Sequence, residues 1–336
     1  MAKNSSLTAA KSAKEDEFYT QLSDIEKELK HYRSHFEGKV VYLNCDDPRV
    51  SNFFHYFSYN FEKLGLKKLI ATCYKSQDID LFSEHNTEQA VYLEYEGDKD
   101  GDLVPGPNEI GIKPLKGDGD FRSSESIELL KQADIVVTNP PFSLFREHVA
   151  QLIDHNKKFL LIGSQNAITY KDVFRLFKED KLWQGYNSGD MAFQVPDHYP
   201  PRETRFWVDE SGTKWRSLGN ACWFTNLDTP KRHEDLILYK SYSPAEFPTY
   251  DNYDAIEVGR TEHIPADYDG VMGVPITFLS RYNPDQFEIV GSDHEVKDGL
   301  LPWLVREGWT GKVDRAYLNG KRMYARILIR RKGAPA

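Results

Sequence analysis

The chain lacks any apolar run that approaches the roughly 18 residues needed to cross a bilayer, so we expect no membrane span. Residues 1–14 are small, polar and mildly basic, which predicts a flexible N-terminus and not a signal peptide. Cysteine is scarce as well, because Cys45, Cys73 and Cys222 lie far apart and show no paired spacing. This pattern favours buried free thiols in a reducing cytoplasm over disulfides or a zinc site.

An excess of positive charge is also absent, because the formal net charge is −9. The charges are segregated, however. Residues 76–128 hold fourteen acidic side chains against four basic ones, whereas residues 311–332 hold eight basic ones against Asp314 alone. Local patches decide whether a protein binds phosphate, so the basic segment is either a phosphate-binding surface or a solvated face. Its candidate residues are Lys312, Arg315, Lys321, Arg322, Arg326 and Arg330.

Hydrophobic residues make up 40% and charged residues 28% of the 336 positions, which is typical of a globular enzyme with a full core and a smaller second region. In the first half, short apolar segments alternate with stretches of helical periodicity, which predicts a parallel, doubly wound α/β sheet. The strands are expected at 40–43, 69–74, 135–138 and 159–163, and the helices at 21–36, 53–64, 127–131 and 142–153.

After about residue 185 the sequence becomes richer in β-structure. A hairpin is predicted where the segments 205–208 and 213–216 flank a polar turn, and 221–227 is typical of a buried strand that returns to the main sheet. Trp207 and Trp215 of this hairpin are either DNA contacts or, more often in aromatic hairpins, packing residues.

A second hairpin is predicted around Asn319-Gly320, a dipeptide that suits a tight two-residue turn. On a regular strand after this turn, Arg322, Arg326 and Arg330 have the same parity and would line one face. The stretch 241–250, which contains two prolines, is the best candidate for a domain boundary.

The most informative segment of the chain runs from Asp134 to Phe142. Ile135–Thr138 is apolar and β-branched, which predicts a short buried strand, and two prolines then end it. Asn139 is thereby held in a rigid, extended turn at the carboxyl end of a strand. Open α/β sheets bind their ligands at such ends, so Asn139 is a candidate site residue.

Such a turn suits transfer to the exocyclic amino group of a nucleobase. That nitrogen is a poor nucleophile, because its lone pair is delocalised into the ring. The side-chain oxygen of Asn139 and the carbonyl oxygen of Pro140 can each accept one of its N–H bonds, which frees the lone pair. Phe142 offers a face on which the base can stack, a contact worth about 1–3 kcal/mol. The alternative is a surface turn before a helix, with Phe142 as an ordinary core residue.

In these residues the chain resembles the amino-methyltransferases that use S-adenosylmethionine, whose signature is Asn/Asp/Ser-Pro-Pro-Phe/Tyr/Trp. The combination of Asn with Phe is similar to the branch that methylates N6 of adenine. Further segments resemble the EcoRI-type adenine-specific DNA methyltransferases, so that the resemblance covers about residues 15 to 331. These segments are 16–20, 44–54, 139–146, 166–170, 223–227 and 274–279.

The resemblance implies a Rossmann-like S-adenosylmethionine-dependent methyltransferase fold, with a doubly wound, mostly parallel seven-stranded sheet. Residues 15–240 would form the catalytic core. Residues 241–336 would form a smaller, β-rich target-recognition region that binds DNA. The order of the motifs along the chain is similar to the family's γ-like arrangement.

Most enzymes of this class have a glycine-rich turn after the first strand, and this chain lacks it. The turn at 44–48 contains no glycine, a substitution that the EcoRI-type group shares. The resemblance gives Asn44, Asp46 and Asp47 to the cofactor, with a solvated turn as the alternative for the two aspartates. The acidic residue usual after the second strand is also missing. Tyr74 stands near its place and either stacks on the cofactor's adenine or packs in the core.

Two further segments resemble cofactor motifs of the family. Asp120 and Phe121 follow a glycine and match the motif in which an acidic side chain accepts from the cofactor's adenine amine. The alternative for Asp120 is one more charge in an acidic loop. The run Phe18, Tyr19 and Thr20 matches the N-terminal motif that closes over the methionine end of the cofactor.

The resemblance implies an enzyme that transfers a methyl group directly to N6 of an adenine flipped out of duplex DNA. Asn139, Pro140 and Phe142 would be catalytic, and Asn139 would also border the cofactor. No metal is expected, because methyl transfer from a sulfonium needs no Lewis acid. No obligate protein partner is expected, a monomer suffices, and the enzyme would work in the cytoplasm of a prokaryotic or phage-infected cell.

Two alternatives are open at this point. Related Asn-Pro-Pro motifs serve the methylation of RNA adenine or of a protein amide, although the resemblance along the whole chain argues against both. The missing glycines of the cofactor turn would also suit a catalytically inert DNA-binding protein. Measurable binding of S-adenosylmethionine would exclude that alternative.

Overall fold

The computed structural model describes residues 18–45, 51–72 and 90–333. Asp46, Asp47 and Tyr74, which the sequence assigns to the cofactor, lie outside the described residues, as do Cys73 and residues 1–14.

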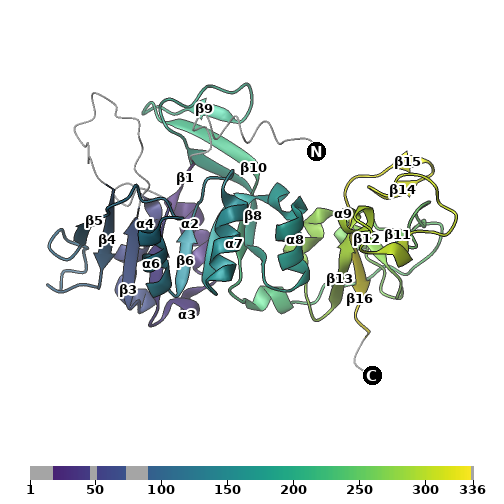
Figure 1. The fold of residues 1–336 in the computed structure, drawn as a ribbon, viewed down its shortest axis with the longest axis horizontal. Helices are drawn as coiled ribbons and strands as arrows, with labels where there is room; N and C mark the ends of the chain where they lie inside the picture. Colours follow the sequence, from purple (N-terminus) through teal and green to yellow (C-terminus); the bar gives the residue numbers. More distant parts are fainter. Residues whose placement is uncertain (1–17, 46–50, 73–89, 334–336) are drawn as a thin grey trace. The chain divides into compact units, whose positions relative to one another are not determined.

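The described residues form two compact units (Figure 1). The first contains the residues up to Val173 together with Gln184–Leu227. The second contains Phe174–Trp183 together with the residues from Asp228 onwards. In the described part of the chain, no helix combines the length and the apolarity that a membrane span requires.

A ten-stranded mixed sheet forms the centre of the first unit (Figure 1). Its strand order is β1-β8-β10-β7-β6-β2-β3-β4-β5, and β9 pairs with β10. The strands are β1 (Tyr19–Thr20), β2 (Val40–Leu43), β3 (Lys68–Thr72), β4 (Val91–Tyr95), β5 (Gly111–Pro114), β6 (Ile135–Thr138), β7 (Lys158–Ser164), β8 (Trp183–Gln194), β9 (Phe206–Val208) and β10 (Lys214–Thr225).

The prediction of a mostly parallel, seven-stranded sheet is wrong. The neighbours β3, β2, β6 and β7 run parallel to one another. β4 and β5 continue the sheet in antiparallel pairing on one side, and β10 pairs antiparallel with β7 on the other. Parallel neighbours need a long crossover, usually a helix, whereas a short turn such as the one between β9 and β10 joins antiparallel strands. The α/β class itself is confirmed.

Helices connect the parallel strands, and two of the predicted helices are each split in two. The helices are α2 (Leu22–Leu29), α3 (Arg33–Phe36), α4 (Asn52–Tyr59), α5 (Phe61–Leu64), α6 (Ser124–Gln132), α7 (Phe145–Asp154) and the 3-10 helix η1 (Gln165–Thr169); α8 (Lys171–Lys178) spans the boundary between the units. The helix predicted at 53–64 is interrupted at Asn60, whose Nδ2 donates to the carbonyl oxygen of Tyr56. It ends at Gly65, whose φ of 62° suits glycine.

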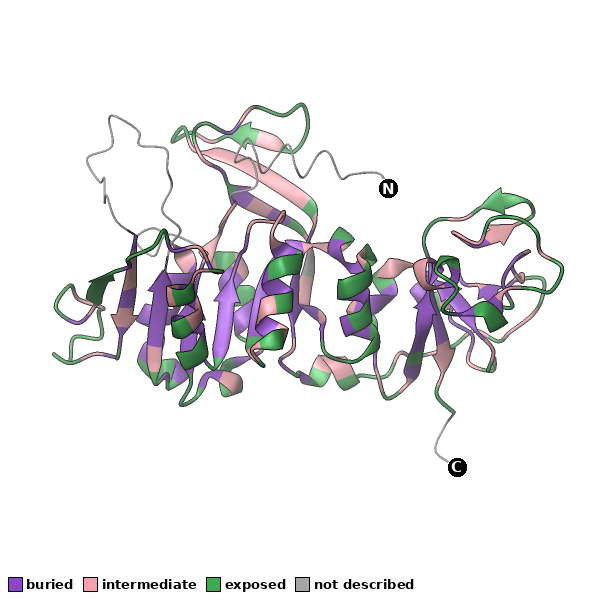
Figure 2. Ribbon diagram, viewed as in Figure 1, coloured by how far each residue is buried: buried purple, intermediate pink, exposed green. Residues whose placement is uncertain are grey.

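Central strands and inward helix faces form the core of the first unit, as Figure 2 shows by their purple colour. Every residue of β2 and β6 is buried. Glu28 is also buried, and it is satisfied by hydrogen bonds from the backbone N–H groups of Tyr186 and Asn187 at 2.6 and 2.7 Å. Such pairing offsets part of the cost of burying its carboxyl group, whose pKa burial still raises, and links α2 to β8.

The second unit has a smaller four-stranded sheet of order β11-β12-β16-β13 and a separate hairpin, β14-β15. Its strands are β11 (Ile256–Glu257), β12 (Met272–Val274), β13 (Phe287–Ser292), β14 (Tyr317–Leu318), β15 (Lys321–Arg322) and β16 (Ile327–Arg331). Its helices are α9 (Asp293–Lys297) and the 3-10 helices η2 (Pro230–His233), η3 (Thr261–His263), η4 (Ile276–Arg281) and η5 (Pro302–Leu304).

The hairpin predicted at Asn319-Gly320 is confirmed, because both residues have the positive φ that a tight hairpin turn requires, 51° and 73°. The single strand expected after it is wrong. β15 ends at Arg322 and β16 begins at Ile327, so the chain leaves the ladder between them. Arg322, Arg326 and Arg330 therefore do not share one strand face.

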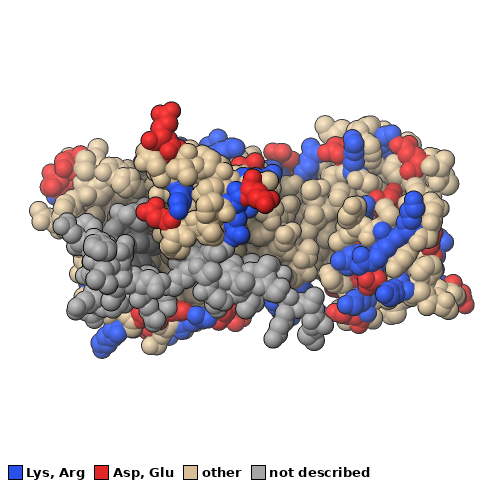
Figure 3. All heavy atoms as spheres, turned by 90° about the horizontal axis from the view of Figure 1, so that it is seen from above, with Lys and Arg blue, Asp and Glu red and all other residues tan. Residues whose placement is uncertain are grey.

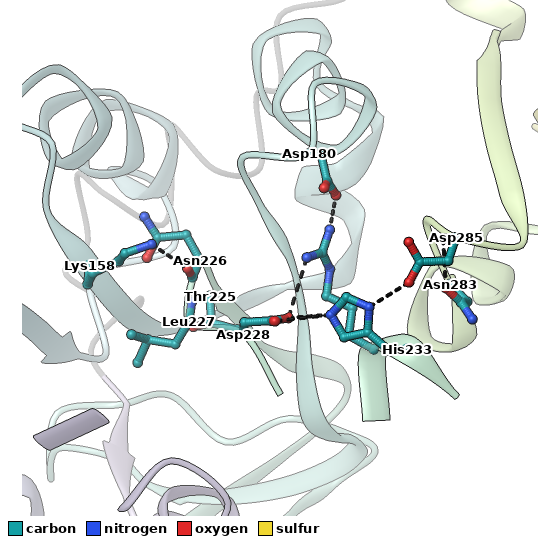
Figure 4. A network of polar contacts seen from close by, with 10 residues as sticks. Lys158, Asp180, Thr225, Asn226, Leu227, Asp228, His233, Asn283 and Asp285 are labelled. Carbon is teal, nitrogen blue, oxygen red and sulfur yellow. Dashed lines mark hydrogen bonds and ion pairs between the residues drawn. The ribbon is translucent and has the colours of Figure 1, made fainter. Parts of the chain in front are cut away.

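A polar network in the second unit centres on an exposed histidine (Figure 4). His233 lies between two carboxylates, with Nδ1 2.7 Å from Asp285 and Nε2 3.0 Å from Asp228. Hydrogen bonds to Asp285 and then to Asp228 raise the pKa of His233 above its ordinary value. Arg232 adds ion pairs with Asp180 and Asp228.

Neither Cys45 nor Cys222 forms a disulfide within the described residues, and of the two only Cys222 is buried as predicted. Cys222 is buried, and burial raises the pKa of its thiol to about 12. Cys45 is only partly buried.

Candidate active site

Two buried asparagines follow neighbouring strands at one edge of the large sheet. β2 and β6 are parallel, with Val41 opposite Ile135, so their carboxyl ends meet at that edge. Asn44 follows β2 and Asn139 follows β6, with exposed fractions of 3% and 6%. Open α/β sheets bind ligands at this edge, which is the position that the sequence predicts for Asn139.

Asn139 has one satisfied and one unsatisfied end. Its Nδ2 donates to the carbonyl oxygen of Phe18 at 2.5 Å and to Thr20 Oγ1 at 3.2 Å. The Phe18 carbonyl is an acceptor only, so this contact fixes which end of the amide carries the N–H groups. Asn139 Oδ1 is buried, and within the part of the chain that the structure describes it has no hydrogen-bond partner. An acceptor left in this state costs roughly 1–3 kcal/mol, which a ligand that donates to it would recover.

The N-terminal motif is held against this turn by β1. Tyr19 and Thr20 pair with β8, Thr20 lying opposite Phe193. Asn52 Nδ2 also donates to the carbonyl oxygen of Thr20 at 2.7 Å. The structure thus brings Phe18 and Thr20 to Asn139, although more than a hundred residues separate them from it in the sequence. This proximity is what their assignment to one site requires.

Aromatic side chains line the same region. Phe142 is partly exposed, and its ring centroid lies 5.5 Å from that of Phe18. Phe18 in turn lies 5.6 Å from Phe193 and 6.2 Å from Tyr199. Pro140 is a buried residue of the turn that follows β6. Helix α7 begins after this turn, at Phe145. Phe142 therefore belongs to the turn and not to the helix that the sequence predicts from 142.

His148, a residue that the sequence analysis did not select, lies among the predicted cofactor residues. Its Nε2 is 3.2 Å from Asn44 Oδ1, and its ring meets the ring of Phe121 edge-on with centroids 4.9 Å apart. The side chain is fully buried, and burial lowers the pKa of His148 to about 3, so the imidazole is neutral. Its only signal in the sequence is a polar residue on the apolar face of a predicted helix.

Asp120 and Phe121 have different environments. The Asp120 carboxylate forms a two-point ion pair with Arg122, at 2.8 Å to Nε and 2.5 Å to Nη2. Phe121 is buried, and its carbonyl oxygen accepts from Gln151 Nε2 at 3.0 Å. A ligand that donates to Asp120 would therefore share this carboxylate with Arg122.

Of the six basic residues predicted to contact phosphate, Arg326 is internal. It is 9% exposed, and its guanidinium forms a two-point ion pair with Glu257, at 2.6 Å from Nη2 and 3.0 Å from Nε. Glu257 also accepts from the hydroxyl of Tyr250, which fills the core of the unit. These contacts give Arg326 a structural position and leave its guanidinium little exposed surface for a phosphate.

The other five basic residues lie nearer the surface of the second unit. Figure 3 shows Lys and Arg side chains, interspersed with acidic ones, over the part of this unit that contains β14 and β15. Lys312, Lys321 and Arg322 are exposed, and Arg322 pairs with Asp314 at 2.7 Å. Arg315 and Arg330 are partly exposed.

The hairpin tryptophans pack on each other. Trp207 lies directly opposite Trp215 across the β9–β10 ladder, and their rings are nearly parallel at 6.3 Å. Trp215 Nε1 also donates to Asp209 at 2.8 Å. Such cross-strand aromatic pairs stabilise a projecting hairpin, which supports the packing interpretation.

One group of acidic side chains in the described residues could surround a metal ion. The carboxylates of Asp98, Asp100 and Asp102 lie within 4.8 Å of one another on an exposed loop. Each of them accepts hydrogen bonds from backbone N–H groups of the same loop, so the turn itself accounts for the cluster. His31 and His35 have the spacing of a helical ligand pair but belong to no such group among the described residues.

The comparisons with known proteins agree with one another. The family described as "Adenine-specific methyltransferase EcoRI" matches residues 6–332. The Type II methyltransferase M.EcoRI of Escherichia coli is 50% identical over 335 residues, which covers 98% of each chain. M.MgeORF184P of Mycoplasma genitalium is 40% identical and M.MpnI of Mycoplasma pneumoniae 39% identical, each covering 96% of this chain and 97% of its own. No solved structure matches the chain.

Proposed function

Because the chain belongs to the EcoRI family of adenine-specific methyltransferases, we propose that it transfers the methyl group of S-adenosylmethionine directly to N6 of an adenine flipped out of duplex DNA. The observation that carries this proposal is the buried, unpaired Oδ1 of Asn139 at the carboxyl end of β6. The relatives of this chain are Type II methyltransferases, so we further propose a role in a restriction–modification system.

Asn139 and its neighbours suit the amine of a flipped adenine. Asn139 Oδ1 accepts one N–H of the amine, and the carbonyl oxygen of Pro140 accepts the other. These two acceptors draw the nitrogen towards tetrahedral geometry and free its lone pair for attack. Phe142 stacks on the base, a contact worth about 1–3 kcal/mol. The hydrogen bonds from Nδ2 to Phe18 and Thr20 hold the amide in the orientation that this chemistry needs.

The residues at the carboxyl edge of β2 and β6 fit the cofactor. When bound, S-adenosylmethionine supplies an electrophilic methyl group on a sulfonium. Asn44 would hold it at the end of β2, Phe121 and Asp120 would hold its adenine, and the Phe18–Thr20 segment would close over its methionine end. Asp46, Asp47 and Tyr74 complete the proposed set. The neutral imidazole of His148 adds no positive charge that would repel the sulfonium.

The two compact units divide the work in this proposal. The first unit provides a Rossmann-like catalytic core, which contains most of the expected 15–240 but neither 174–183 nor 228–240. The second, which contains all of 241–336, recognises the target, with Lys312, Arg315, Lys321, Arg322 and Arg330 against phosphate. A monomer suffices for one strand at a time, with no obligate protein partner. We propose the cytoplasm of a prokaryotic or phage-infected cell as its place of work.

Transfer of tritiated methyl groups to plasmid DNA tests the proposal, with the wild type beside Asn139→Ala and the labelled nucleosides identified after digestion. We expect label in N6-methyladenine with the wild type and almost none with the variant. No label in DNA, with intact cofactor binding, would contradict the proposal and favour RNA adenine or a protein amide. Failure to bind the cofactor at all would favour an inert DNA-binding protein.

A further inference from the structure

Helix α7 has a polar pair on its buried side. His148 and Gln151 are three residues apart on a helix whose other inward residues, such as Val149 and Leu152, are apolar. Residues three apart lie on the same face of a helix. Burying an imidazole costs free energy that an aliphatic residue would not, so the contacts of His148 must offset that cost.

The two polar side chains reach two different loops. His148 Nε2 lies 3.2 Å from Asn44 Oδ1, in the turn that follows β2. Gln151 Nε2 donates to the carbonyl oxygen of Phe121 at 3.0 Å, in the segment that precedes α6. His148 also packs edge-on against the ring of Phe121. These are the two loops that the proposed function gives to the cofactor.

The contact with Asn44 concerns the tautomer of His148. With Asn44 Oδ1 facing the ring, the hydrogen bond places the imidazole proton on Nε2. Nδ1 is then unprotonated, and it is buried with no partner among residues 18–45, 51–72 and 90–333. Asn44 Oδ1 thus faces His148 Nε2 and also accepts from Cys45 Sγ, which lies 3.5 Å away.

We propose that His148 is a positioning residue for the cofactor, which acts through Asn44 and Phe121 and does not touch the reacting atoms. Gln151 supports it by fixing the backbone at Phe121. This inference rests on the proposed function. It adds that the helix leaving the Asn139 turn also shapes the cofactor site, so one element organises both substrates.

The test compares His148→Leu, His148→Gln and Val149→Ala in the full chain. Leu removes the hydrogen bond but keeps an apolar filling, whereas Gln has an Nε2 of similar reach that can donate to Asn44. Val149→Ala is the matched control. Val149 is buried on the same helix, and its aliphatic side chain cannot form a hydrogen bond with either loop. Titration calorimetry without DNA gives the affinity for S-adenosylmethionine, and chemical denaturation gives the stability of each variant.

We expect His148→Leu to weaken cofactor binding about tenfold, the effect of one lost hydrogen bond, and His148→Gln to restore it to within about threefold. In His148→Leu the KM for the cofactor should rise. The kcat at saturating cofactor and the affinity for duplex DNA should stay nearly unchanged. Wild-type affinity in His148→Leu would overturn the inference, as would an equal loss in an equally destabilised Val149→Ala. If the wild type itself does not bind S-adenosylmethionine, the proposed function fails first.

Discussion

The edge of the large sheet and the basic segment of the second unit both contain a buried polar residue that the sequence selects, but only one of them is unpaired. Asn139 Oδ1 has no hydrogen-bond partner among the described residues, although the residue is 6% exposed. The guanidinium of Arg326 is similarly buried and is held by Glu257 at two points. At the end of a parallel strand, the unsatisfied oxygen of Asn139 is available to a ligand, whereas the two-point pairing of Arg326 with Glu257 gives that guanidinium a structural role.

The two described histidines with the clearest environments show the same difference. His148 in the first unit is neutral because burial lowers its pKa to about 3. His233 in the second unit has a raised pKa because Asp285 and Asp228 flank it near the surface. One histidine serves as a fixed hydrogen-bond donor, and the other as a charge that titrates with pH.

The largest expected effect is on stability and concerns Arg326. Arg326→Ala leaves Glu257 buried without its partner, so the free energy of unfolding of the second unit should fall by about 3–5 kcal/mol in chemical denaturation. Exposed Lys321→Ala is the control and should change it by about 0.5 kcal/mol or less. A stable Arg326→Ala protein with weakened DNA binding would show that Arg326 contacts phosphate after all.

Phe142 tests the other side of the comparison. Phe142→Ala removes the stacking face for the target base, a loss of about 1–3 kcal/mol in binding free energy. The kcat/KM for duplex DNA should therefore fall roughly 5- to 150-fold. Phe142→Tyr keeps the ring and should stay close to the wild type. An equal loss in both variants, measured by steady-state methyl transfer, would mean that Phe142 is only a packing residue beside Phe18.

Lys312 and Lys321 should affect DNA binding and nothing else. If each contacts a phosphate, the double variant Lys312→Ala/Lys321→Ala reduces the slope of log affinity against log salt by about 0.9 per contact. Fluorescence anisotropy with a labelled duplex over a range of salt gives this slope. The rate of methyl transfer at saturating DNA should not change, and an unchanged slope would remove both lysines from the interface.

The smallest effect is the pH dependence that His233 causes. Its pKa is raised on folding, so its contribution to stability is complete below the unfolded pKa of about 6.5 and is lost as pH rises through the folded pKa. Because His233 and its two carboxylate partners are exposed, we expect this contribution to the free energy of unfolding to be about 1 kcal/mol or less. His233→Gln should abolish this pH dependence above pH 6, as measured by denaturation at successive pH values. A variant that becomes less stable with rising pH in the same way as the wild type would exclude His233 as the cause.

Several parts of the fold are predictable because their causes are local. The β-branched run Ile135–Thr138 and the prolines after it specify β6 and its end, and the structure has this strand at the predicted residues. Asn319-Gly320 specifies its hairpin because few residues tolerate positive φ at consecutive positions. The direction of strand pairing is not local. The antiparallel pairing of β10 with β7 depends on how the chain returns after the β9 hairpin, which periodicity does not show.

The candidate site divides in the same way. Asn139 and Phe142 stand in a short motif whose chemistry can be read from the residues, and Phe18 with Thr20 follows from the resemblance. His148 is missed because helical periodicity shows only that it faces the core, not that Asn44 lies opposite. The burial of Arg326 is missed because parity assumes one regular strand, whereas the chain leaves the ladder between β15 and β16.

The most direct test is the single-turnover rate of methyl transfer by Asn139→Ala, with enzyme and S-adenosylmethionine in saturating excess over duplex DNA. Loss of a preorganised hydrogen-bonding partner of the reacting group typically costs about 10²–10³-fold in rate. We therefore predict a fall of this size, with the affinities for the cofactor and for DNA within about threefold of the wild type. A rate close to that of the wild type would contradict the assignment of the unpaired Oδ1 to the target amine.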